Sequence, residues 1–141
     1  MKKILVAIDI ARTGGNETVI NTALDIARTM DGTLVFLHVI EPTPGYVLSE
    51  VPEGILANRK DEAEAKLKEM TDNLYGAEAV VREGPPATEI LDYAARIKAD
   101  LIVVHSHDPG LSDYFLGSVA SRIVRHAHCS VYVVRHPDNH A

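Results

Sequence analysis

The chain has 141 residues, and its 14 Lys and Arg against 20 Asp and Glu give a formal net charge of −6 with histidine neutral. This length fits one domain with a substantial core, and an acidic chain without a basic stripe argues against duplex nucleic acid as its partner. The single cysteine, Cys129, excludes an internal disulfide and favours a reducing, cytoplasmic setting. The short apolar run after Met1-Lys2-Lys3 predicts neither a signal peptide nor a membrane span.

The first half of the chain predicts two strands, each followed by a helix. Residues 4–8 form a short apolar run, and a helix then begins with Asn16 as its N-cap and ends at Asp31-Gly32. Residues 33–40 form the second apolar run, followed by a proline-containing loop at 41–54. The next helix is indicated by apolar residues at helical spacing, namely Ala63, Leu67, Met70 and Leu74.

The second half continues the alternation. A weaker strand at 78–81 leads to Gly84-Pro85-Pro86, where proline suits the first turn of a helix. The apolar positions of that helix are Ile90, Leu91, Ala94 and Ile97. A strand at 101–104 precedes a helix from Ser118 to His126, and the last strand is 131–134. On the helix from Ser118 to His126, the positions expected to face the core are Val119, Ile123 and Ala127.

This order predicts an α/β fold, a doubly wound parallel sheet with helices on both faces, formed by residues 1–141 as a single domain. The strong runs are continuous rather than alternating, which is typical of strands buried on both faces. Ligands of such sheets bind beyond the carboxyl ends of the strands. Two segments therefore matter most: Asp9 with the glycines that follow it, and the stretch 105–118.

The stretch 105–118 ends in Gly117-Ser118 at a helix start. Glycine permits a close backbone approach, and the N–H groups of the first turn together with the Ser118 hydroxyl could bind phosphate oxygens. The plainer interpretation is that Ser118 is only an N-cap. These residues alone leave both readings open.

Nearly the whole chain resembles the universal stress protein family. The resemblance rests on the segments 3–9, 37–40, 84–86, 99–104, 116–118 and 125–131. Ser106-His107 followed by a proline, and later Tyr-x-Leu-Gly-Ser, is most similar to the single-domain bacterial branch of stress proteins F and G. The family's ATP motif, GxxGxxxxxxxxxG followed by Ser or Thr, is matched by Gly117 and Ser118. Its first two glycine positions fall on His105 and Asp108, and the spacer is one residue shorter.

The resemblance implies strand order 3-2-1-4-5 and a stress-response regulatory or sensor module that binds ATP, with Mg²⁺ or Mn²⁺ as a possible companion. It also implies a homodimer formed through the Val131 to Val134 edge strand, with an unknown protein partner. The alternative is a nucleotide-free dimeric interaction protein whose phosphate site is closed by His105 and Asp108. A carboxylate at Asp108 near a triphosphate requires compensation by a metal ion or by a cation such as His107 or Arg12.

Carried over by position, the resemblance gives each candidate nucleotide-binding residue a role. Asp9 would contact the ribose or the adenine side, beside a wall formed by Ala7 and Ile8. The backbone of Val39 would meet the adenine edge. The chain passing beneath the nucleotide would be Val104, His105, Ser106, His107 and Asp108, and the donors to the phosphates would be Gly117, Ser118 and Val119. The simpler interpretations are that Val39 is only a buried strand residue and that the Asp9 carboxylate only caps the following loop.

Other chemistries fit the sequence poorly. His105 and His107 lack a third metal ligand at fixed spacing, and Ser106 between histidines is not the G-x-S-x-G serine of a hydrolase. A Walker A loop and a G-x-G-x-x-G fingerprint are both missing from the sequence. We expect a binding protein with at most slow ATP hydrolysis or autophosphorylation, because the sequence offers no evident general base.

Overall fold

The computed structural model describes residues 2–12, 14–42, 53–74, 76–106 and 116–135. The elements in chain order are β1 (Lys2–Ala7), α1 (Asn16–Met30), β2 (Gly32–Ile40), α3 (Glu53–Thr71), β3 (Glu78–Glu83), α4 (Pro86–Ile97), β4 (Leu101–His105), α5 (Ser118–His126) and β5 (Ser130–Val134). Each predicted strand and helix is present. The described helices include none that is long and apolar enough to cross a bilayer.

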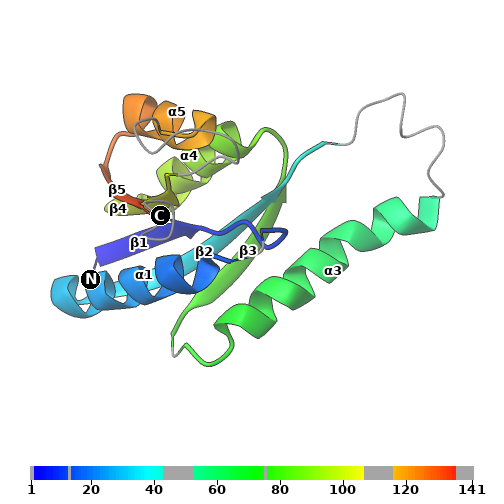
Figure 1. The fold of residues 1–141 in the computed structure, drawn as a ribbon, viewed down its shortest axis with the longest axis horizontal. Coiled ribbons are helices and arrows are strands. Elements are labelled where there is room, and N and C mark those ends of the chain that lie inside the picture. Colours follow the sequence, from blue (N-terminus) through cyan, green and yellow to red (C-terminus); the bar gives the residue numbers. More distant parts are fainter. Residues whose placement is uncertain (1, 13, 43–52, 75, 107–115, 136–141) are drawn as a thin grey trace.

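The five strands form one parallel sheet in the order β3-β2-β1-β4-β5, which confirms the expected fold class. Helices α1 and α3 cover one face of the sheet, and α4 and α5 cover the other (Figure 1). The chain runs outward from β1 to β3 and then returns to β4, on the other side of β1. The switch point of this topology therefore lies between β1 and β4, whose carboxyl ends are adjacent.

Two apolar clusters explain why the strand sequences are continuously hydrophobic. Ile4, Val6 and Phe36 belong to the cluster under α1 and α3. Leu5, which lies between two of them in sequence, belongs with Ile123 to the cluster under α4 and α5. Alternate side chains of a strand point to opposite faces, so a strand covered on both sides requires apolar residues at every position.

The start of α1 differs from the prediction. The N-cap is Gly15, with φ 90° and ψ −26°, and Asn16 is the first helical residue. Glycine adopts this left-handed conformation without the steric cost that a side chain brings. The predicted end of α1 is confirmed, because Asp31 is its left-handed C-cap with φ 51°.

Candidate functional site

The loop after β1 is organised by Asp9. The Ile8 N–H donates to the Leu37 carbonyl at 2.9 Å, which extends the sheet pairing up to this point. The exposed Asp9 carboxylate then accepts from the Ala11 N–H at 3.0 Å, and the Asp9 carbonyl accepts from the Arg12 N–H at 3.1 Å. Asp9 thus has the loop-capping role of the plainer reading. Its exposed carboxylate also lies where a ligand of this fold would pass.

Asn16 anchors the same loop from the other side. Its Nδ2 donates to the Asp9 carbonyl at 2.9 Å. The first residue of α1 is therefore hydrogen-bonded directly to the backbone that follows β1. The side chain that was expected to cap the helix instead fixes the loop in front of it. The helix start is consequently tied to the carboxyl edge of the sheet.

His38 is a functional candidate that the sequence reasoning did not single out. Its ring is buried on β2, and Nδ1 lies 3.0 Å from the Ile8 carbonyl and 3.4 Å from the Ile10 nitrogen. A histidine within an otherwise apolar strand run was the available signal. The shorter contact favours a proton on Nδ1, donated to Ile8, which fixes the backbone directly before Asp9.

The carboxyl end of β4 is joined to the start of α5. His105 is the last residue of β4, and the Ser106 N–H donates to the Val134 carbonyl at 3.0 Å. The Gly117 N–H donates to the Ser106 carbonyl at 2.7 Å. Gly117 is the N-cap of α5, with φ −62° and ψ 162°, so Ser118 is the first helical residue and not the cap. The first turn of α5 therefore begins beside the end of β4.

Arg12 and His105 connect the two halves of the switch point. Nη1 of Arg12, in the loop after β1, lies 3.0 Å from Nδ1 of His105 at the end of β4. A guanidinium has only donors, so His105 Nδ1 accepts in this pair. The contact places a cationic side chain at the edge where the two strands end.

The other predicted site residues that the structure describes also lie toward this edge. Ala7 ends β1 and Val39 is next to the last residue of β2, and both are half-buried against the α4 and α5 face. Val104 is buried in β4, and Val119 lies half-buried in the first turn of α5. The structure thus places Val39 in a strand, half-buried rather than buried, and places Ala7, Val39 and Val104 at neighbouring strand ends. His107 and Asp108 lie outside the described residues.

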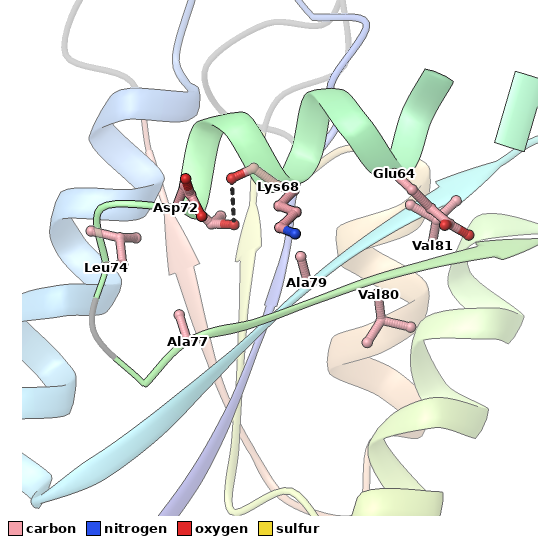
Figure 2. A pocket seen from close by; sticks show the side chains of 9 residues that line it. Glu64, Lys68, Asp72, Leu74, Ala77, Ala79, Val80 and Val81 are labelled. Atoms are coloured by element: carbon pink, nitrogen blue, oxygen red, sulfur yellow. Dashed lines mark hydrogen bonds between the residues drawn. The ribbon is translucent and has the colours of Figure 1, made fainter. Parts of the chain in front are cut away.

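A groove of about 530 Å³ lies elsewhere, between α3 and β3. Figure 2 shows Lys68 of α3 reaching toward Ala79 of β3, with Glu64 at one end and Asp72 at the other. The Thr71 hydroxyl in its wall donates to the Leu67 carbonyl at 2.9 Å. These mixed charges favour no particular ligand, and none of the predicted site residues within the described ranges lines the groove. The switch point is therefore the candidate site.

The described part of the chain contains no group of three or more His, Cys, Asp or Glu that could hold a metal ion. Any divalent cation at the switch point would take most of its ligands from a bound phosphate and water, as Mg²⁺ usually does.

Comparison with known sequences shows which family the chain resembles. Residues 1–135 match the family described as the Universal stress protein family. Universal stress protein MJ0531 of Methanocaldococcus jannaschii is 35% identical over 123 residues, which cover 82% of this chain and 72% of that protein. Universal stress protein G of Shigella flexneri is 28% identical over 141 residues, covering 95% of this chain and 99% of that protein.

Solved structures show the same fold. The universal stress protein UspA from Lactobacillus plantarum has a TM-score of 0.70 and 27% identity, covering 95% of this chain and 97% of that one. A universal stress protein in complex with cAMP has a TM-score of 0.70 at 21% identity, covering 94% and 96% of the two chains. The latter likeness concerns the fold alone.

Proposed function

Since the chain belongs to the universal stress protein family, we propose that it binds ATP at the carboxyl ends of β1 and β4 and acts as a regulatory or sensor module in a stress response. In this proposal residues 1–141 form a single nucleotide-binding domain that works in the cytoplasm. It is a binding protein, and any ATP hydrolysis or autophosphorylation is slow.

The observation that supports the proposal most is the junction of β4 with α5. The Gly117–Ser106 hydrogen bond of 2.7 Å sets the first turn of a nine-residue helix at the switch point. The N–H groups of a first helical turn have no partner within the helix and attract anions. Family membership supplies the ligand class, and the cAMP complex of a protein with the same fold indicates that such a sheet can hold an adenine nucleotide.

The proposed roles follow the chain's own positions. The exposed carboxylate of Asp9 accepts from ribose hydroxyls, while the half-buried Ala7 and Val39 lie beside the base. Gly117, Ser118 and Val119 provide the donors to the phosphates. The other proposed contacts are Ile8, Val104, His105, Ser106, His107 and Asp108. When a divalent cation accompanies ATP, it neutralises phosphate charge near Asp108.

We also propose that the protein is a homodimer that pairs through β5. This strand is an edge of the sheet, and Tyr132 on it is one of the large hydrophobic side chains that remain exposed. An unpaired strand edge is a template for association with another chain. Pairing two copies around a two-fold axis would cover the β5 edge of each copy.

A second candidate function is favoured by the Arg12–His105 contact. Because it crosses the switch point at 3.0 Å, it could fill the space that phosphates need. The protein would then be a dimeric interaction protein without a nucleotide, with His105 and Asp108 closing the site.

One experiment separates the two functions. One sample of the purified protein is heat-denatured, and its supernatant is analysed for nucleotides by ion-exchange chromatography. A second, native sample from which nucleotide has been removed is titrated with Mg-ATP in a thermal-unfolding assay. ATP binding predicts released adenine nucleotide and a stabilisation of about 2.7 kcal/mol at 100 times Kd. Mg-GTP is the control for base recognition. Absence of both released nucleotide and a thermal shift would rule out the ATP proposal and leave the interaction protein.

A further inference from the structure

Arg12 and His105 meet across the switch point although 93 positions separate them in sequence. Arg12 comes from the loop that Asp9 organises, and His105 from the end of β4. The Nη1–Nδ1 distance of 3.0 Å is that of a well-formed hydrogen bond. The contact therefore fixes a guanidinium at the edge where the two central strands end.

The chemistry of this pair determines the state of the histidine. All five N–H groups of a guanidinium donate, and none of its atoms accepts. His105 must then present a lone pair on Nδ1, so its ring is neutral and carries its proton on Nε2. A neutral ring orients the guanidinium without cancelling its charge. A guanidinium carries several donors in a fixed fork, which matches the geometry of phosphate oxygens.

The charge pattern of the sequence makes Arg12 distinctive. Between Lys3 and Arg28 it is the only Lys or Arg, and the whole chain carries a net charge of −6. The nearby Asp9 adds a negative charge to the same loop. A polyphosphate approaching this acidic chain requires local positive charge, and arginine is the side chain best suited to hold two phosphate oxygens at once.

We propose that Arg12 binds the terminal phosphates of the nucleotide and makes the site selective for polyphosphates, and that His105 is a positioning residue that orients Arg12. This inference rests on the proposed nucleotide binding and adds to it the part of the ligand that Arg12 recognises. It also gives His105 a function at a position where the family's motif has glycine.

The test is a titration-calorimetry comparison of ATP and adenosine. We expect Arg12→Ala to weaken ATP binding about 10- to 100-fold, the range of a lost charge-assisted contact, and to leave adenosine affinity within about twofold. Arg12→Lys should recover only part of the ATP affinity, because an ammonium cannot form the paired contact. Arg28→Ala, which removes an exposed arginine paired with Asp25 on α1, is the matched control and should change neither affinity.

Two variants test the positioning role of His105. His105→Asn places an oxygen acceptor near the position of Nδ1 and should retain most of the ATP affinity. His105→Leu removes the acceptor and should weaken ATP, but not adenosine, to about the level of Arg12→Ala. In Arg12→Ala protein the two His105 variants should no longer differ. Thermal unfolding of each variant verifies that it is folded.

The outcomes distinguish this inference from the function on which it rests. If the wild-type protein binds ATP and Arg12→Ala binds it equally well, the inference is wrong and ATP binding stands. If Arg12→Ala binds ATP more tightly, the Arg12–His105 pair obstructs the site and the inference is overturned. If the wild-type protein binds neither ligand, the proposed function fails and this inference fails with it.

Discussion

Lys3 and Asp100 exchange two hydrogen bonds at the amino edge of the sheet. The Lys3 N–H donates to Asp100 Oδ2 at 2.8 Å, and the Asp100 N–H donates to the Lys3 carbonyl at 2.8 Å. This pair ties the beginning of β1 to the turn that enters β4. Because β1 and β4 flank the switch point, this contact joins the amino ends of the two strands. The candidate site lies at the carboxyl ends of the same strands.

Asp100 also affects Cys129. Burial raises the pKa of the Cys129 thiol above its ordinary value, and the negative charge of Asp100 raises it further. A raised pKa leaves less thiolate at a given pH, and the thiolate is the nucleophile. We expect Cys129 to react with iodoacetamide more slowly than an unstructured cysteine peptide at pH 8, and faster as the pH rises. Mass spectrometry of a time course measures this, and equal rates would contradict it.

Asp100→Asn tests the electrostatic part of that effect. The substitution removes the charge but keeps an oxygen that can accept from the Lys3 N–H. The pKa of Cys129 should fall, and alkylation at pH 8 should accelerate by about twofold to fivefold. High salt should reduce the difference, because Asp100 is exposed. Asp92→Asn, an exposed carboxylate on α4, is the control and should leave the rate unchanged.

Gly84, between β3 and α4, is expected to tolerate no side chain. Its φ is +150°, and an added Cβ would lie 2.9 Å from Cγ of Glu89. Glu89 cannot move away freely, since it pairs with Arg82 at 2.8 Å, and the Arg82 guanidinium lies 5.4 Å from the Tyr93 ring centre. Gly84→Ala should lower the free energy of unfolding by about 1–3 kcal/mol. Urea denaturation monitored by circular dichroism measures the loss.

Two variants divide that loss into its causes. In a Glu89→Ala background the close atoms are gone, so the cost of Gly84→Ala should become smaller. Gly76→Ala, at φ +76° with nothing within 4 Å of the added Cβ, gives the cost of a side chain at a positive φ without a steric contact, although its φ differs from that of Gly84. An equal cost of Gly84→Ala with and without Glu89 would exclude the steric contact as a cause.

The strand order was predictable from the sequence through the family resemblance, and the strand positions from local hydrophobicity. The run at 4–8 is apolar at every position because Ile4 and Leu5 are buried on opposite faces of the sheet. The start of α1 was less predictable. Asn16 is an excellent capping residue by preference, but its amide is used on the Asp9 carbonyl, and Gly15 adopts the conformation that the tight loop requires.

The places of the candidate site residues in the fold were predictable, but their contacts were only partly so. Asp9 and Gly117 follow from the rule that ligands bind at strand ends. Neither the Arg12–His105 hydrogen bond nor the His38–Ile8 hydrogen bond can be read from spacing, because each joins residues brought together only by the sheet. The sequence suggested Arg12 as a cation for phosphate compensation, and the structure supplies its partner.

Asp9→Asn should separate the two roles of Asp9. The Asn side-chain oxygen can still accept from the Ala11 N–H, so the free energy of unfolding should change by no more than about 0.5 kcal/mol. An amide is a weaker acceptor for ribose hydroxyls than a carboxylate, and ATP affinity should fall about 3- to 10-fold. Calorimetry with 2′,3′-dideoxy-ATP is the control. If Asp9 contacts the ribose, wild type and variant should bind this analogue equally, whereas an unchanged loss would place Asp9 elsewhere on the ligand.

Tyr132 provides the test of association through β5. Its side chain is 47% exposed on an edge strand that pairs with β4 on its inner side. Tyr132→Lys places a charge in any interface between two β5 strands and should weaken dimerisation by about 10-fold or more, while the charge remains solvated in the monomer. Sedimentation velocity over a concentration series measures the change.

The opposite edge of the sheet offers the matched control for that experiment. Ala79 is exposed on β3, the other edge strand, so Ala79→Lys adds the same charge at that edge, where it lies beside Lys68 of the α3–β3 groove. If β5 is the paired edge, Ala79→Lys sediments as wild type and only Tyr132→Lys shifts toward the monomer. The reverse pattern would assign association to β3. A wild-type chain that remains monomeric at micromolar concentration would contradict the proposed dimer, because β5 would then not pair with β5 of a second copy.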